Sequence, residues 1–320
     1  METEKNLTTV SEFIILGFPS LQKLYPVLFL VFLIIYLFTV TGNILIFVTV
    51  GLNYNLHIPM FYLLNHLSAM EVCYTSIIVP KMLSNFVSQN RRISFNGCMI
   101  QLYLFSSLSA SECYLLTVMA YDRFLAICKP LHYSSKMTNT TSMQLACSSW
   151  LGGFICPILP VALISQLEFC GPNQINYFYC DAQPLLRLAC SNTHVTETAI
   201  TILATGLIFT SFLLTVISYI FIISTILRIP SATGRKKSFS TCGSHLTVVI
   251  IYYGTIVCMY IQPMSRFSLD INKVLSLLYT VVTPVLNPII YSLRNKEIKE
   301  SFGKLTKRIL KIENSLNKEN

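Results

Sequence analysis

A few ionisable side chains lie inside or at the end of long apolar stretches of this sequence. Glu71 and Glu112 are each surrounded by apolar residues, and Asp122 and Arg123 adjoin each other where such a stretch ends. Groups of this kind in an apolar environment pair, stay protonated or share a cation. They are the first candidates for a site. The structural alternatives are an interfacial anchor for Arg123 and a neutral hydrogen-bonded network for the two glutamates.

The histidines do not form a pattern that would bind a catalytic metal. A metalloprotease helix carries two histidines four residues apart with a glutamate after the first, whereas the five histidines of this chain are scattered. An aspartyl-type enzyme would need a pair of acids. Glu71 and Glu112 could supply such a pair, but no surrounding motif supports catalysis. A transporter would show repeated halves with matching broken helices, and the sequence has no such repeat. We therefore predict neither an enzyme nor a transporter.

The elements that must position these residues are membrane-spanning helices. Of the 320 residues, 53% are hydrophobic and 12% are charged, whereas a soluble domain carries about 25% charged residues. A helix needs about 20 apolar residues to cross a bilayer. The predicted spans are residues 24–50, 58–86, 99–126, 143–167, 199–227, 237–262 and 274–293. The fold class is therefore an all-α membrane protein, a seven-transmembrane helix bundle.

Basic residues predict the orientation of this bundle. The net charge is +9, and 15 of the 23 lysines and arginines fall within residues 294–320 or in the loops on the same side. This bias indicates an extracellular N-terminus (residues 1–23) and a cytoplasmic C-terminus in the plasma membrane, rather than a nucleic-acid partner. The sequon at Asn6 would then be open to glycosylation. Residues 294–310 are basic and amphipathic, so we expect a short eighth helix against membrane lipids, followed by a tail.

Four of the 11 cysteines fall on the predicted outer side, where disulfides persist. They are Cys98 at the start of the third span and Cys170, Cys180 and Cys190 in the loop after the fourth. Four cysteines allow three pairings, and spacing alone does not choose between them. A bond from Cys98 would hold this loop over the mouth of the bundle.

Helical phase predicts a ligand pocket in the outer half of the bundle. Phe105, Ser109 and Glu112 share one face of the third span, and Ser106 lies beside them. Such a surface suits a small, mostly apolar ligand held by dispersion and one or two hydrogen bonds. No acid or base stands out at pocket depth, so we do not expect a charged ligand. Plain helix packing is the alternative for each of these residues.

Ordered motifs along the whole chain resemble the odorant-receptor family of rhodopsin-like G-protein-coupled receptors. They include Leu56-His-Ile-Pro-Met-Phe, Met119-Ala-Tyr-Asp-Arg-Phe-Leu-Ala-Ile-Cys-Lys-Pro-Leu-His-Tyr, Lys237-Ser-Phe-Ser-Thr-Cys-Gly-Ser-His-Leu and Pro284-Val-Leu-Asn-Pro-Ile-Ile-Tyr. The chain departs mildly from the family at Glu71, where aspartate is common, and at Phe124-Leu125, where Tyr-Val is usual.

This resemblance implies a function and a disulfide pairing. The chain would bind a small volatile odorant and activate a heterotrimeric G-protein of the stimulatory olfactory type, which raises cAMP. A non-olfactory chemosensory receptor for a small metabolite is the alternative. The implied disulfides are Cys98–Cys180 and Cys170–Cys190.

The resemblance also implies roles for single residues. Tyr253 and Tyr260 are similar to pocket positions of the family. No cofactor is expected beyond a sodium ion between Glu71 and Glu112, with Asn43 and Asn287 nearby. The implied switch and G-protein-coupling residues are Asp122, Arg123, Tyr219, Asn287, Pro288 and Tyr291.

Overall fold

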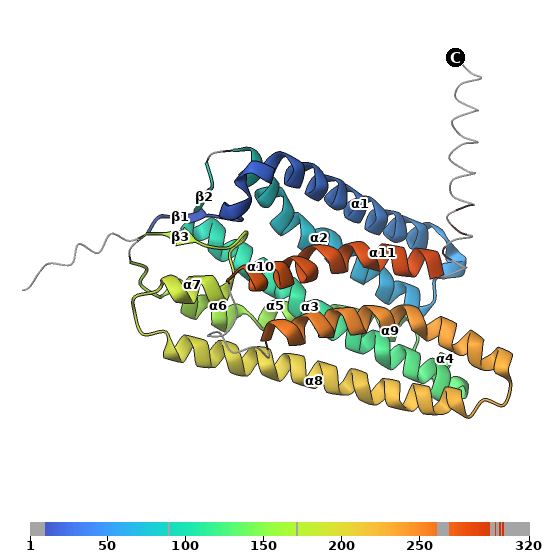
Figure 1. Cartoon of the computed structure of the whole chain (residues 1–320). Helices are drawn as coiled ribbons and strands as arrows, with labels where there is room; N and C mark the ends of the chain where they lie inside the picture. The colour runs from blue at the N-terminus through green and yellow to red at the C-terminus, as the bar shows by residue number, and fades with distance from the viewer. Residues whose placement is uncertain are drawn as a thin grey trace, which may run out of the picture.

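The computed structural model describes residues 10–88, 90–170, 172–260 and 269–294, together with residues 298, 301 and 303. In this part of the chain, long helical rods pack into one bundle and a small sheet covers one end of it (Figure 1). Each rod overlaps one predicted span. The rods are α1 (Tyr25–Leu52), α2 (Pro59–Val87), α3 (Phe95–Cys128), α5 with α6 (Asn139–Ile155, Ile158–Ser165), α8 (His194–Leu227), α9 (Ala232–Tyr260), and α10 with α11 (Leu269–Leu277, Thr283–Arg294).

The surface of the bundle is apolar. Among the described residues, five rods are long and apolar enough to cross a bilayer, and α9 contains a shorter apolar stretch, Cys242–Ile256. Ile34 on α1 and Phe209 on α8 are 66% and 61% exposed. A helix satisfies its own backbone hydrogen bonds, so an apolar outer face suits lipid.

A proline interrupts the fourth rod, and a π-helical segment interrupts the seventh. The fourth rod breaks between α5 and α6 at Cys156 and Pro157, because proline has no backbone donor. The seventh rod contains a π-helical segment, η3 (Leu278–Val282), immediately before α11. Such segments are frequent at functional sites, and η3 carries Tyr279 into the centre of the bundle.

A three-stranded sheet covers the end of the bundle where α3 begins. Strand β1 (Glu12–Ile15) pairs antiparallel with β2 (Arg92–Ser94) and parallel with β3 (Gln174–Ile175). Phe13 and Ile15 of β1 are fully buried. The N-terminal segment is therefore built into this cover, together with the short helix α7 (Ala182–Leu188). We call β1, β2, β3 and α7 the outer lid.

A buried lysine joins the outer lid to the seventh rod. Lys273 of α10 is 1% exposed. Its Nζ donates to the Gly17 carbonyl (2.8 Å) and to Asn176 Oδ1 (2.7 Å). These bonds connect the N-terminal segment, the loop after the fourth rod and the seventh rod at one point.

Helix α3 is the central rod and contacts α2, α5, α8 and α9. It packs tightly against α5 at Gly153, where an added Cβ would lie 2.5 Å from Ser111 N and 2.7 Å from Ser107 O. The glycine therefore sets the spacing of these two helices.

Only part of the predicted eighth helix is described. Residues 298, 301 and 303 are helical, and Ile298 is fully buried. Asn53 Nδ2, just after α1, donates to Ser301 Oγ (2.7 Å). The rest of residues 295–310 and the Asn6 sequon lie outside the described residues.

Candidate functional site

A cavity of about 150 Å³ lies next to the outer lid, between α3, α6, α8 and the seventh rod. Phe105, Ser106 and Ser109 all line it, so the predicted face of α3 does adjoin a cavity. Most of the other lining side chains are apolar, as suits a weakly polar ligand. The other described residues of the lining are Leu102, Ala110, Cys113, Cys156, Pro157, Pro160, Val161, Ile164, Tyr179, Asp181, Ala182, Ile200, Leu203, Ala204, Leu207, Ile208, Ile256 and Tyr279.

Hydroxyl groups connect the cavity to the sixth and seventh rods. The Ser109 and Tyr279 hydroxyls form a hydrogen bond across the cavity wall. Tyr252 of α9 donates its hydroxyl to the Ser109 carbonyl (3.0 Å). Ser109 therefore links α3 to both α9 and η3 at the cavity wall.

Tyr253 and Tyr260 of α9 are the two tyrosines that the family resemblance implies as pocket residues. Tyr253 is 2% exposed and its ring packs 5.3 Å from that of Phe212 on α8. It is not among the described residues that line the cavity; its neighbour Tyr252 faces α3 instead. Tyr260 is the last residue of α9, and its side chain lies outside the described residues.

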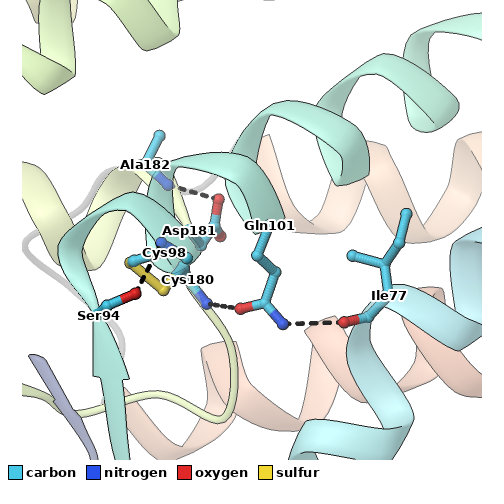
Figure 2. Close-up of a disulfide and its surroundings, with 8 residues drawn as sticks. Ile77, Ser94, Cys98, Gln101, Cys180, Asp181 and Ala182 are labelled. Carbon is cyan, nitrogen blue, oxygen red and sulfur yellow. Dashed lines mark hydrogen bonds between the residues drawn. A yellow bond between two sulfur atoms is a disulfide. The ribbon is translucent and has the colours of Figure 1, made fainter.

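A disulfide fixes the loop after the fourth rod to the start of α3 (Figure 2). It joins Cys98 to Cys180, and Cys180 N donates to Gln101 Oε1 (3.0 Å). Gln101 Nε2 donates in turn to the Ile77 carbonyl on α2 (3.0 Å). A second disulfide closes the loop on itself between Cys170 and Cys190. These are the two pairs that the family resemblance implies.

Asp181, the residue that follows Cys180, is an acid in the cavity wall. Asp181 Oδ1 accepts a hydrogen bond from Ala182 N (2.7 Å) and so caps α7 (Figure 2). Burial raises the pKa of the Asp181 carboxyl to about 6, although the Ala182 bond acts in the opposite direction. Our expectation of no acid at pocket depth was therefore wrong. Asp181 is remote from the spans in sequence, and the Cys98–Cys180 bond brings it to the cavity.

The two glutamates predicted to share a site are neighbours below the cavity. Glu71 and Glu112 are 1% and 5% exposed, and their carboxyl groups contact each other. Asn287 Nδ2 donates to Glu71 Oε1. Glu112 Oε1, Asn43 Oδ1 and Asn287 Oδ1 are buried and have no hydrogen-bond partner among the described residues. Carboxylate and amide oxygens of this kind are the ligands of hard cations, so the residues present fit sodium.

An ion pair closes the opposite end of α3. Arg123 Nη2 lies 3.0 Å from Asp122 Oδ2, and Asp122 is fully buried. Tyr133, on the loop helix α4 (Pro130–Lys136), donates its hydroxyl to Asp122 Oδ1 (2.9 Å). Arg123 and Tyr133 therefore occupy the two carboxylate oxygens of Asp122. Burial and the adjacent Asp122 charge raise the pKa of the Tyr133 phenol.

The remaining predicted switch residues lie on the neighbouring rods. Tyr219 of α8 forms a 2.6 Å hydrogen bond with His245 Nδ1 of α9. Pro288 packs against α1 at Gly42, where an added Cβ would be 3.0 Å from the proline Cβ. Tyr291 belongs to α11, and its side chain lies outside the described residues.

Comparison with known proteins agrees with this arrangement. The model of the olfactory receptor family matches residues 32–309. The chain belongs to the olfactory receptor family. It is 52% identical to human Olfactory receptor 6N1, covering 95% of this chain and 97% of the relative. It is 50% identical to human Olfactory receptor 11L1 (95% and 94% covered) and 48% identical to mouse Olfactory receptor 6B9 (94% and 95% covered).

Membership of this family decides the class of the protein. It is an odorant receptor of the G-protein-coupled type, a multi-pass protein of the plasma membrane and not an enzyme. The family carries a seven-transmembrane bundle, as the spans predict. The transporter alternative is thereby set aside.

Several residues of this olfactory receptor were missed by reasoning from sequence. They are Asp181 and Tyr279 at the cavity and Tyr133 and His245 at the opposite end. Tyr133 and His245 stand in motifs that carry the resemblance, so position in a motif was the available signal. No motif in the sequence pointed to Asp181 or Tyr279, because their positions depend on a disulfide-tethered loop and on a π-helical turn.

Proposed function

We propose that this receptor binds a small, mostly apolar odorant in the cavity beside α3 and activates a heterotrimeric G-protein at the Asp122–Arg123 end. The observation that supports this most strongly is that one helix carries both sites. Phe105 and Ser109 line the cavity, and Asp122 lies 17 residues beyond Phe105. At 1.5 Å per residue the two sites are roughly 25 Å apart along α3.

The proposed coupling runs through contacts that span the rods. A ligand changes the populations of two states only if it contacts them differently. The hydrogen bonds from Ser109 to Tyr279 and Tyr252 give the ligand such contacts with the sixth and seventh rods. Movement of α9 relative to α8 would then break the Tyr219–His245 bond and open the surface around Arg123.

We propose a stimulatory, olfactory-type G-protein and an orientation with the outer lid outside the cell. The two disulfides beside the outer lid suit an oxidising exterior. Asn6 then lies outside, where it can be glycosylated, and residues 294–320 lie in the cytoplasm.

We also propose that a sodium ion is held near Glu71 and Glu112. The supporting observation is the set of buried oxygens without a hydrogen-bond partner on Glu112, Asn43 and Asn287. When bound, the ion supplies positive charge that offsets the two carboxyl groups. It would tie α2 and α3 to the first and seventh rods in the resting state.

The coupling proposal is tested in cells that express the full-length receptor, by measuring cAMP in response to an odorant panel. We expect odorant-dependent cAMP that Arg123→Ala abolishes and that Arg92→Ala, a variant at the outer lid, retains. Surface expression of each variant is measured in parallel. Odorant-dependent cAMP that persists in Arg123→Ala would refute the assignment. A receptor that responds to metabolites but not to volatile odorants would favour the non-olfactory alternative.

A further inference from the structure

We infer that Asp181 selects the chemical class of the ligand: the cavity prefers a small apolar molecule that carries one hydrogen-bond donor, best of all a primary alkylamine. The inference rests on the proposed use of this cavity as the odorant site. It deepens that proposal by naming the polar group of the ligand and the residue that receives it.

The geometry of Asp181 leaves one carboxyl oxygen for a ligand. Oδ1 is occupied by Ala182 N at 2.7 Å. Among the described residues, Oδ2 has no hydrogen-bond partner, and the half-buried side chain lines the cavity. A carboxylate oxygen accepts hydrogen bonds. A ligand in the cavity can therefore donate an N–H or O–H to this oxygen.

The position of Asp181 is fixed before any ligand arrives. The Cys98–Cys180 disulfide and the bond from Cys180 N to Gln101 Oε1 hold the adjacent residue against α3. The capping bond to α7 holds the side chain itself. Little conformational freedom is then lost when the carboxylate binds a donor, which favours affinity.

Among the described residues, no lysine, arginine or histidine forms an ion pair with the Asp181 carboxylate. The described lining of the cavity contains no lysine, arginine or histidine, and Asp181 is its only acid. The Tyr179 phenol on the same loop interacts electrostatically with Asp181. The other ionisable groups of the described lining are the Tyr279 phenol and the Cys113 and Cys156 thiols. On α7, Arg187 lines a separate surface groove, and Lys273 of α10 donates to Gly17 and Asn176.

The apolar walls determine the remainder of the ligand. Leu203 and Leu207 of α8 and Val161 and Ile164 of α6 all line the cavity. An alkyl chain suits such walls, and an ammonium group suits the carboxylate because a charge-assisted hydrogen bond is stronger than a neutral one. An alcohol offers a weaker donor, and an ether of the same length offers none.

The test uses three probes with seven non-hydrogen atoms each: hexylamine, 1-hexanol and methyl pentyl ether. Binding to the purified full-length receptor is measured by ligand-dependent thermal stabilisation at pH 7.5. We expect hexylamine to bind at least 10-fold more tightly than the ether, with the alcohol between them. Equal binding of amine and ether to the unaltered receptor, or no binding of the amine, overturns the inference.

Asp181→Asn is the matched variant, because its amide oxygen can still accept from Ala182 N and preserve the loop. We expect it to remove the preference for the amine and to leave ether binding unchanged. Glu168→Gln removes an exposed acid from the same loop and serves as the control. A preference that survives in Asp181→Asn, or that falls equally in Glu168→Gln, contradicts the assignment.

A pH series on the unaltered receptor tests the inference without any substitution. An alkylammonium stays protonated between pH 5 and 7.5, since amines of this kind titrate near 10. The Asp181 carboxylate takes up a proton as the pH falls through about 6. The amine preference should therefore decline from pH 7.5 to pH 5, and an unchanged preference argues against Asp181.

These readouts separate the inference from the proposed function. Thermal stabilisation requires no G-protein, so amine binding without any cAMP response would refute only the coupling. Odorant-dependent cAMP with no preference for donors would refute only the role of Asp181.

Discussion

Removing the Tyr133 hydroxyl should raise the basal activity of the receptor. In the structure this hydroxyl donates to Asp122 Oδ1 at 2.9 Å, while Arg123 occupies the other oxygen. Tyr133→Phe leaves Oδ1 buried without a donor. The carboxylate is then less stable, and its ion pair with Arg123 weakens.

The size of the effect follows from the bond that is lost. A hydrogen bond to a charged group contributes about 1.5 kcal/mol at the low end of its range, and about 1.4 kcal/mol corresponds to a tenfold change in an equilibrium constant. If the bond exists only in the resting state, Tyr133→Phe multiplies a small active fraction by roughly ten.

The assay is odorant-free cAMP in cells, divided by the amount of receptor at the surface. Tyr121→Phe is the matched control, because Tyr121 directly precedes Asp122 on α3 and is 43% exposed. We expect basal cAMP to rise in Tyr133→Phe and to stay unchanged in Tyr121→Phe. Equal basal activity in Tyr133→Phe and the unaltered receptor would refute the resting role of this bond.

Three further predictions concern the bundle. Basal signalling of the unaltered receptor should fall as sodium replaces potassium, and Glu112→Gln should lose that dependence; the same sodium response in both would refute the cation site. Gly153→Val should lower the thermal midpoint of the receptor by several degrees, since overpacking costs about 1–3 kcal/mol and the added atoms would meet the backbone at Ser111. Gly206→Val, on α8 where no atom lies within 4 Å of an added Cβ, should change the midpoint little, and equal losses in the two variants would contradict the packing argument. Lys273→Met should also lower the midpoint, because two carbonyl acceptors lose a charged donor; an unchanged midpoint would show that this link does not stabilise the lid.

Much of the helical scaffold could be predicted because it depends on local sequence. Apolar runs of sufficient length specify spans, and the period of a helix places Phe105 and Ser109 on one face of α3. The cavity does adjoin this face. The same reasoning placed Glu71 and Glu112 at similar depth, where their carboxyl groups contact each other.

The parts that sequence did not reveal depend on contacts between distant segments. Strand β1 has only four residues, and its partners in β2 and β3 lie about 80 and 160 residues away. Asp181 enters the cavity wall because a disulfide places its loop. Tyr253 follows the helical period yet packs against Phe212, so helical phase alone did not distinguish it from Tyr252.

The most direct test of the account is whether filling the cavity removes the odorant response. Ala204 of α8 lines the cavity, whereas a Cβ added at Gly206 on the same helix would have no described atom within 4 Å. We predict that Ala204→Phe abolishes odorant-dependent cAMP and preserves surface expression and basal cAMP, while Gly206→Phe responds like the unaltered receptor. A full response in Ala204→Phe would contradict the assignment of this cavity as the odorant site.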